Sequence, residues 1–231
     1  MANVAFSKGG SLASRGAKPA LFYRSRERGI LPVTRALDIL VSSIALLFFL
    51  PLMMVIAALV YVVDPGPIFF GQFRLGHEGR RFRCWKFRTM VIDAETRLTE
   101  LLATDPAARA EWAKDCKLRN DPRITSIGRF LRKSSLDELP QLLNVLIGDM
   151  SLVGPRPIVH AEVERYGRYF KDYCKVRPGI TGLWQISGRN DVSYRRRVAL
   201  DVKYSRSKCL SLDLTILFMT IPRVIFARGS Y

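Results

Sequence analysis

The longest hydrophobic stretch of the chain covers residues 39–63 and contains no charged side chain. A helix needs about 20 apolar residues to cross the roughly 30 Å hydrocarbon core of a bilayer, so this stretch is long enough to enter a membrane. Pro51 lies at its middle, where a proline removes a backbone donor and kinks or breaks a helix. The pattern therefore predicts a membrane segment that is interrupted at Pro51.

Basic residues stand on both sides of this stretch: Arg24, Arg26, Arg28 and Arg35 precede it, and Arg74, Arg80, Arg81, Arg83, Lys86 and Arg88 follow it. Cytoplasmic segments beside membrane helices are enriched in Lys and Arg, so a helix that crosses once should have one depleted flank. Each half of the stretch, about 12 residues or roughly 18 Å of helix, is too short to cross alone. We therefore expect a re-entrant helix whose ends share one face; the alternative is a single transmembrane helix with a tolerated proline kink.

The rest of the chain alternates between short strand-like and helix-like patterns. Strand patterns occupy residues 68–70 and 81–87 around a hairpin-like turn at 76–79, and helical patterns occupy residues 93–118, interrupted near Pro106, and residues 124–147. Residues 210–226 are largely apolar but too short to span, which predicts a segment that lies in the membrane interface. Residues 1–28 have no sustained period and are rich in Ser, Gly, Ala and Arg, which is typical of a disordered basic tail.

The charge balance calls for an anionic partner, because 37 basic residues stand against 20 acidic ones and give a net charge of +17. Nucleic acid, anionic lipid head groups and a phosphorylated substrate are the candidates. The apolar stretch favours lipid, and no nucleic-acid-reading motif accompanies the charge, so we expect no nucleic acid partner. The four cysteines show neither metal nor redox spacing, which is typical of reduced thiols.

The candidate chemistry is concentrated at Asp137 and Glu138, two adjacent carboxylates that follow a pair of basic residues beginning at Arg132. Leucines at helical spacing come next, and Pro140 suits the first turn of a helix, so we expect Asp137 at or near the N-cap. Helix N-termini bind phosphate; one carboxylate would face a substrate phosphorus while the other binds a metal or takes a proton. The alternative is plain capping, because Ser135 and Glu138 have the spacing of a capping box.

Arginines recur beside glycine and proline turns in the second half of the chain. Arg156 lies between two prolines, Arg177 precedes a Pro-Gly pair, and Arg189 follows a glycine. Flanking prolines restrict the backbone, and a guanidinium group matches phosphate oxygens with two parallel hydrogen bonds. One such loop would be a plain turn with a solvated arginine, but three of them with a carboxylate pair indicate a polyphosphate site.

Five motifs together resemble a known family: Lys86-Phe87-Arg88-Thr89-Met90, Ser135-Leu136-Asp137-Glu138-Leu139, Gly148-Asp149-Met150-Ser151, Gly154-Pro155-Arg156-Pro157 and Arg177-Pro178-Gly179-Ile180-Thr181-Gly182. In this order, over residues 35–222, the chain resembles the bacterial sugar transferases, which are monotopic phosphoglycosyl transferases. Within the family it is most similar to the transferases that initiate exopolysaccharide synthesis with galactose- or another hexose-1-phosphate.

The resemblance implies a two-step reaction. Asp137 would attack the β-phosphate of a UDP-sugar, UDP-galactose or UDP-glucose, releasing UMP and keeping the sugar phosphate, which undecaprenyl phosphate would then accept. Asp137 and Glu138 would hold Mg²⁺, or Glu138 would deprotonate the lipid phosphate. Arg132 and Arg156 would bind phosphate or nucleotide groups, supported by Lys86, Arg88, Asp149, Arg177, Arg189 and Asp201.

The resemblance also implies a monotopic α+β protein, mostly helical, on the cytoplasmic face of the bacterial inner membrane and in contact with anionic lipids. Its expected parts are a disordered basic tail at 1–30, a re-entrant helix at 31–64 broken at Pro51, a catalytic domain at 65–209 and a C-terminal interfacial segment at 210–231. Leu50 stands where the family often has serine, and residues 93–118 have no assigned role.

Two questions stay open from the sequence. The first is the oligomeric state, for which a homo-oligomer is the candidate. The competing class of function is a non-enzymatic, membrane-bound basic scaffold that binds anionic lipid or nucleic acid.

Overall fold

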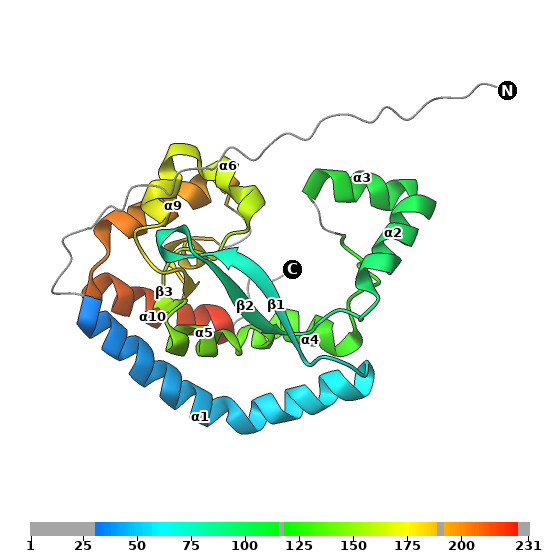
Figure 1. Cartoon of the computed structure of the whole chain (residues 1–231), viewed down its shortest axis with the longest axis horizontal. Helices are drawn as coiled ribbons and strands as arrows, with labels where there is room; N and C mark the ends of the chain where they lie inside the picture. The colour runs from blue at the N-terminus through cyan, green and yellow to red at the C-terminus, as the bar shows by residue number, and fades with distance from the viewer. Residues whose placement is uncertain (1–30, 116–117, 189–191, 226–231) are drawn as a thin grey trace, which may run out of the picture.

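A long helix runs beneath a body of short helices and two small sheets in the computed structural model, which describes residues 31–115, 118–188 and 192–225 (Figure 1). The expected basic tail at 1–30, Arg189 and the last six residues lie outside the described residues. Among the described residues the chain is mostly helical with small sheets, as the sequence predicts.

Helix α1 (Leu31–Val63) is continuous and contains Pro51 in its interior. The predicted break at Pro51 is therefore wrong. An interior proline costs one hydrogen bond and bends the helix, but the remaining bonds on either side carry the helix through. Figure 1 shows α1 as an arc whose two ends turn toward the body. By length and composition, residues Val33–Val63 are sufficient to cross a membrane.

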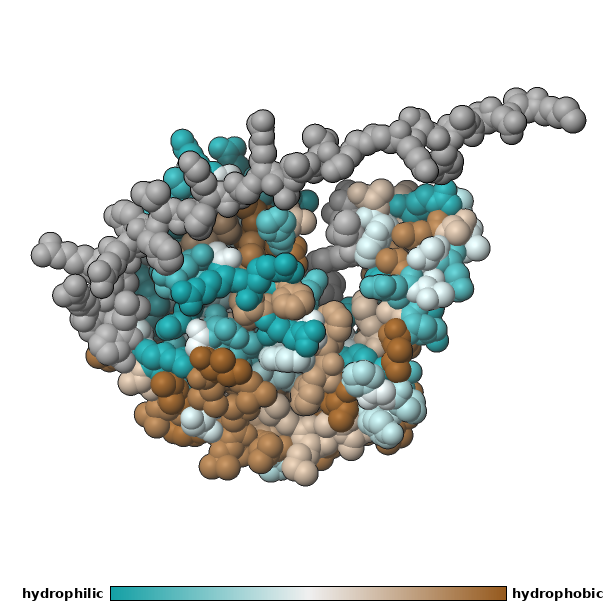
Figure 2. Space-filling model, viewed as in Figure 1, coloured by the Kyte–Doolittle hydropathy of each residue, from teal (hydrophilic) through white to brown (hydrophobic). Residues whose placement is uncertain are grey.

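One face of α1 is buried and the other is exposed. Met53, Ile56 and Val60 pack against Phe87 and Leu131 of the body. The outward face exposes large apolar side chains, among them Leu40, Ile44, Leu47, Phe48, Met54, Val55 and Val62. Figure 2 shows this face as a hydrophobic band along the lower edge of the molecule, below a mostly hydrophilic body. An apolar surface of this extent is typical of a membrane contact.

Two polar side chains fasten the N-terminal half of α1 to the body. Arg35 donates hydrogen bonds of 2.5 and 2.7 Å to two carbonyls in the last turn of α5 (Gln141–Ile147). Carbonyls in the last turn of a helix lack partners within it. The C-cap amide of Gly148 reaches the Val145 carbonyl, and the Arg35 guanidinium group adds a donor to this carbonyl and to the next one. Asp38 is buried and accepts hydrogen bonds from the Ser151 hydroxyl (3.0 Å) and the Leu152 amide (2.9 Å).

An arginine clamp fastens the other end of α1. Asp64 follows the last residue of the helix, and Arg88 binds both its carboxylate, at 2.5 Å, and its carbonyl oxygen. The Ile92 amide donates to the same carboxylate at 3.1 Å. Because Arg88 is buried, this pair is screened less by solvent than a surface ion pair would be. Both ends of α1 are thus tied to one body.

The predicted hairpin is confirmed. Strands β1 (Phe69–Leu75) and β2 (Arg81–Phe87) pair antiparallel around a short 3₁₀ turn, η1 (His77–Gly79). Glu78 and Gly79 adopt positive φ angles of 57° and 71°, which lets the chain reverse there. Strands β3 (Ser151–Val153) and β4 (Gly179–Thr181) form a second, parallel pair.

The helical pattern of residues 93–118 is also confirmed as an interrupted helix. It forms α2 (Ala94–Thr104) and α3 (Pro106–Asp115), which project from the body as an arm (Figure 1). Arg123 lies over the Trp112 ring at 5.0 Å and holds α3 to the chain that follows. The two short helices expected in 124–147 are α4 (Ser126–Ser134) and α5.

The C-terminal half closes the core between the hairpin and α5. Its elements are η3 (His160–Glu162), α6 (Val163–Tyr166), η4 (Gly167–Tyr169), α7 (Phe170–Tyr173), α8 (Leu183–Ile186), α9 (Tyr194–Ser207) and α10 (Leu210–Ile225). Ile216 of α10 is fully buried in the core that also holds Val145 and Met150. The opposite face of α10 exposes Leu214 and Phe218, as an interfacial helix requires, although its placement in a membrane stays a prediction.

The Asp38 contact is testable through stability. Asp38→Leu leaves the Ser151 hydroxyl and the Leu152 amide buried without their acceptor, so the free energy of unfolding should fall by about 1–3 kcal/mol. Thermal unfolding in one detergent measures the loss. Asp93→Leu removes an exposed carboxylate paired with Arg97 and should change stability by less than about 0.5 kcal/mol. Equal losses in the two variants would contradict a fastening role for Asp38.

Candidate active site

The two acidic residues lie in a tight turn between α4 and α5. Ser135 ends α4 in the left-handed conformation, with φ at 59°, and a 3₁₀ turn, η2 (Leu136–Glu138), follows it. Backbone bonds close this turn, since the Glu138 amide donates to the Ser135 carbonyl at 3.2 Å and the Leu139 amide to the Leu136 carbonyl at 3.3 Å. The acidic side chains are therefore not needed to hold the turn together.

Asp137 lies near the start of α5, within the range that was predicted, but not at its N-cap. Pro140 occupies the N-cap position of α5, and Asp137 lies three residues earlier, in the 3₁₀ turn. The proline has no amide hydrogen and a helical φ of −62°, so the helix can begin directly after it. The capping-box alternative fails, because the Ser135 side chain makes no capping hydrogen bond.

Lys86 lies between the two carboxylates. It comes from β2, and its Nζ atom is 2.6 Å from Glu138 Oε1 and 3.6 Å from Asp137 Oδ2. Burial lowers the pKa of Lys86, but the charges of Glu138 and Asp137 and the hydrogen bond to Glu138 together raise it by more, so its pKa lies above the ordinary value. The ammonium group therefore stays protonated and offsets the mutual repulsion of the acids.

The two acids differ in their surroundings. Asp137 is 7 % exposed, and burial raises its pKa above the ordinary value despite the opposing charges of Lys86 and Arg132. Glu138 is more exposed. Burial raises its pKa too, but Lys86, Arg156 and Arg74 together lower it by more, so the pKa of Glu138 lies below the ordinary value. Asp137 is thus the more basic carboxylate of the pair, and Glu138 the more firmly ionised one.

Two predicted phosphate-binding arginines lie beside this pair. The Arg132 Nε atom donates to the Thr89 hydroxyl at 2.9 Å, and its charge acts on Asp137. Arg156 rests on the Trp184 ring at 5.8 Å, and its charge lowers the pKa of both Lys86 and Glu138. Arg156 makes no hydrogen bond or ion pair with the described residues, so its donors are available to an anion.

Arg74 is a site residue that the sequence interpretation missed. Its charge lowers the pKa of Glu138, and its guanidinium donates to the Pro157 carbonyl at 3.2 Å, which holds the Arg156 loop. The alternation of side chains along the predicted hairpin could have identified Arg74. Alternation along a hairpin places Arg74 and Lys86 on the same face, as the observed register has it.

Two of the predicted substrate-binding arginines are placed elsewhere. The Arg88 guanidinium is occupied by Asp64 at the end of α1, which makes it a link to the membrane helix. Arg177 lies near His77 at the hairpin turn, where burial and then the positive charge of Arg177 lower the pKa of the histidine. The geometry joins neither of them to the acidic turn.

Two predicted acidic residues are engaged in structural contacts. Asp201 is 1 % exposed and accepts a 2.7 Å hydrogen bond from the Tyr166 hydroxyl. Burial raises the pKa of Asp201 to about 7. Asp149 accepts a 3.4 Å hydrogen bond from the Asn144 side chain. Each orients a neighbouring side chain, and neither reaches the acidic turn by a direct contact among those of the described residues.

The acidic pair has the donors that a magnesium ion bound together with a diphosphate requires. Within the described part of the chain, no group of three or more His, Cys, Asp or Glu side chains could hold a metal ion. Asp137 and Glu138 offer two carboxylates. Mg²⁺ commonly uses one or two carboxylates and completes its shell with substrate phosphates and water, so the donor set fits that mode of binding.

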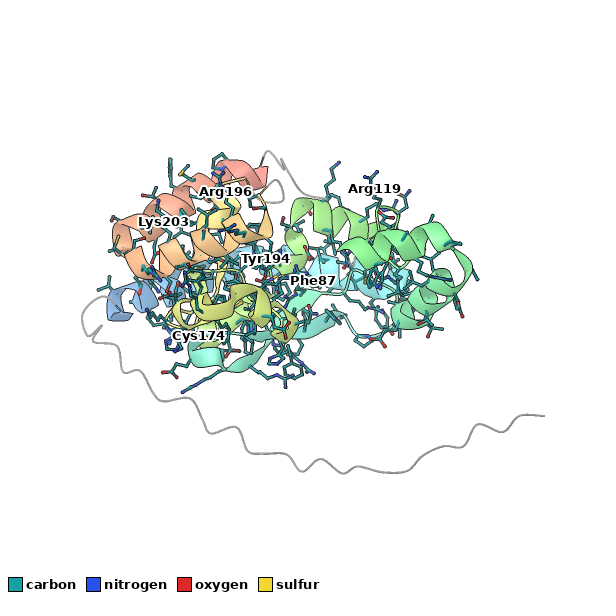
Figure 3. All side chains as sticks on the ribbon, turned by 90° about the horizontal axis from the view of Figure 1, so that it is seen from above. Phe87, Arg119, Cys174, Tyr194, Arg196 and Lys203 are labelled. Atoms are coloured by element: carbon teal, nitrogen blue, oxygen red, sulfur yellow. The ribbon has the colours of Figure 1, made fainter. Side chains whose placement is uncertain are left out.

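The positive charge of the chain is not confined to the site. Figure 3 shows Arg196 and Lys203 extending outward from α9 and Arg119 from the opposite end of the molecule, whereas Phe87, the neighbour of Lys86, lies inside. The outward cations are solvated, while those at the acidic turn are partly buried and act on Asp137 and Glu138.

Comparison with known proteins agrees with this geometry. A profile described as "Bacterial sugar transferase" matches residues 30–227. The chain is 49 % identical to the exopolysaccharide production protein ExoY of Rhizobium meliloti (strain 1021), over 95 % of this chain and 99 % of the relative. It is 54 % identical to the undecaprenyl-phosphate galactose phosphotransferase of Salmonella typhimurium, over 85 % of this chain and 41 % of the relative.

A more distant relative is named for the transfer of glucose-1-phosphate. The UDP-glucose:undecaprenyl-phosphate glucose-1-phosphate transferase of Escherichia coli (strain K12) is 38 % identical, over 85 % of this chain and 41 % of the relative. The profile match and the near-complete alignment with the Rhizobium protein both include the acidic turn and its surrounding cations. The chain therefore belongs to the bacterial sugar transferase family.

Proposed function

We propose that this protein transfers a hexose-1-phosphate from a UDP-sugar to undecaprenyl phosphate and so initiates exopolysaccharide synthesis. The observation that carries the proposal is the Lys86 ammonium between the Asp137 and Glu138 carboxylates, in a chain with relatives that are named for sugar-phosphate transfer to undecaprenyl phosphate. The donor is UDP-galactose or UDP-glucose. The higher identity to the galactose phosphotransferase than to the glucose transferase favours galactose.

In the first step, a carboxylate oxygen of Asp137 attacks the phosphorus that bears the sugar. The bond from this phosphorus to the bridging oxygen breaks, and UMP leaves with the electron pair. Burial favours this role, because the Asp137 carboxylate is more basic than an exposed one and is already stripped of water. Lys86 and Arg132 offset the repulsion between the carboxylate and the anionic diphosphate.

In the second step, an oxygen of undecaprenyl phosphate attacks the phosphorus of the aspartyl phosphate. The bond from phosphorus to the Asp137 oxygen breaks, which restores the carboxylate and yields undecaprenyl-diphosphate-sugar. Glu138 is firmly ionised, so it can take a proton from the incoming lipid phosphate. Arg156, with its donors unoccupied among the described residues, binds a phosphate group of donor or acceptor.

A magnesium ion held by Asp137 and Glu138, when bound, would supply positive charge to the diphosphate oxygens. The protein's own cations act in the same direction without it. Lys86 is held within 3.6 Å of both carboxylates, so the site never carries two uncompensated negative charges.

We further propose that α1 is re-entrant and that the body lies on the cytoplasmic face. Arg35 and Asp38 tie the first part of the helix to the body, and Asp64 with Arg88 ties its end to the same body. A helix that crossed the bilayer once would carry its ends to opposite faces, where a single compact body could not hold both. The arc of α1 and the exposed apolar face of α10 support insertion into one leaflet (Figure 1).

Loss of the nucleophile tests the covalent step. Asp137→Asn should lower the transfer rate by on the order of 10⁴-fold or more and abolish capture of a labelled sugar phosphate on the protein. Incubation with radiolabelled UDP-sugar in the absence of lipid acceptor measures the capture. Asp93→Asn, at an exposed position on the arm, is the matched control and should retain both activities. Full turnover by Asp137→Asn would overturn the covalent mechanism.

The second acid should matter nearly as much. Glu138→Gln is close in shape but neutral, so it removes the proton acceptor and the charge that pairs with Lys86. We expect the turnover rate with undecaprenyl phosphate to fall by about 10²-fold or more, measured as UMP release. A rate near that of the wild type would restrict Glu138 to a structural role.

The topology is testable by cysteine labelling. With the four native cysteines replaced, single cysteines at Ala20 and at Arg80 should react with a membrane-impermeant reagent from the same side of sealed vesicles. Reaction from opposite sides would show that α1 crosses the bilayer once. Phe218→Cys, on the exposed face of α10, should label poorly in vesicles and readily in detergent.

A further inference from the structure

We propose that Asn144 is a positioning residue of the transfer reaction: its carboxamide joins strand β2 to helix α5 and so sets Lys86 against Asp137 and Glu138. The inference rests on the proposed function, in which those three side chains carry the chemistry. No motif of the sequence analysis singled out Asn144.

The carboxamide of Asn144 completes the free edge of β2. Its Oδ1 atom accepts from the Trp85 amide at 3.0 Å, and its Nδ2 atom donates to the Arg83 carbonyl at 2.8 Å. A carboxamide carries the same donor and acceptor as a peptide group, so this side chain takes the place of a neighbouring strand. Asn144 is 0 % exposed, and its two partners would have no water to replace it.

The amide is held in one orientation. The Trp85 amide requires an acceptor and the Arg83 carbonyl requires a donor, so the oxygen and nitrogen of Asn144 cannot exchange places. The Asp149 carboxylate, 3.4 Å from Nδ2, favours the same orientation. The backbone carbonyl of Asn144 accepts from Gly148 and Met150 at 3.1 Å each, which fixes the end of α5 beneath it.

The contact between Asn144 and β2 is close in sequence to Lys86 on one side and to Glu138 on the other. Trp85 directly precedes Lys86 on β2, and α5 begins three residues after Glu138. Lys86 reaches Glu138 at 2.6 Å and Asp137 at 3.6 Å, so a slip of β2 by about 1 Å would change both contacts substantially. Asn144 is the described side chain that hydrogen-bonds the backbone of β2 on both sides of Cys84.

Two substitutions separate positioning from general stability. Asn144→Leu has a similar size but no hydrogen-bonding groups, and Asn144→Asp keeps the acceptor for Trp85 while placing a negative oxygen against the Arg83 carbonyl. Val202→Ala is the matched control, because Val202 is also buried but packs in a separate cluster with Tyr166 and Tyr173. All variants are purified in one detergent and compared by thermal unfolding, kcat and KM for the UDP-sugar.

We expect kcat of Asn144→Leu to fall by about 10- to 100-fold, while KM changes by less than about 3-fold. Asn144→Asp should show the same split with a smaller loss, and it serves as the test if Asn144→Leu does not fold. Val202→Ala should lose thermal stability with kcat within about 2-fold of the wild type. A kcat within about 2-fold of the wild type in both Asn144 variants overturns the proposal.

A double-mutant cycle with Lys86→Gln shows whether Asn144 acts through Lys86. If it does, adding the Asn144 substitution to Lys86→Gln should lower kcat by less than about 2-fold further. If the decreases in kcat caused by the Asn144 substitution and by Lys86→Gln multiply in full, Asn144 has only a structural role and the inference is wrong. The wild type distinguishes the two proposals: absence of UMP release and sugar-phosphate capture there contradicts the proposed function, whereas an active wild type with equally active Asn144 variants contradicts only the positioning role.

Discussion

The ion pairs of Lys86 with Glu138 and Asp137 are the interaction on which the rest of the structure depends. Two carboxylates packed side by side in a partly buried turn repel each other, and without a cation at least one of them would take up a proton. Lys86 keeps the pair charged and in place. A carboxylate nucleophile that must approach an anionic diphosphate needs this compensation before the substrate arrives.

Three consecutive residues, the last two of β2 and the one that follows it, connect this site to helix α1. Lys86 binds the acids, Phe87 is buried against α1, and Arg88 clamps Asp64 at the end of α1. Strand geometry explains why one short segment can do this, because successive side chains point to opposite faces. The position of the acids relative to α1 is therefore set by this one segment. An enzyme that joins a soluble nucleotide sugar to a lipid phosphate needs that coupling.

The polar contacts at the two ends of α1 position this helix, a role that the sequence assigned to Pro51. The sequence predicted a broken helix, and the structure has a continuous, curved one with Pro51 inside. The proline alone does not set where the ends of the helix lie. Arg35 and Asp38 hold one part and Asp64 the other, so the body itself dictates the position of both ends. Polar groups of this kind cost free energy when they are left unpaired in an apolar environment, which favours keeping these attachments formed.

Pattern and composition alone identified the membrane helix, the hairpin, the interrupted arm and the acidic pair with Arg132, because each depends on residues close together in the chain. The resemblance carried by local motifs identified the family for the same reason. Only the tertiary structure showed that Arg88 and Asp201 are engaged with Asp64 and Tyr166, that Arg74 supports the Arg156 loop, and that Asn144 completes the edge of β2. Those contacts join residues 24 to 83 positions apart, and no local period or propensity encodes which of many possible distant partners a side chain meets.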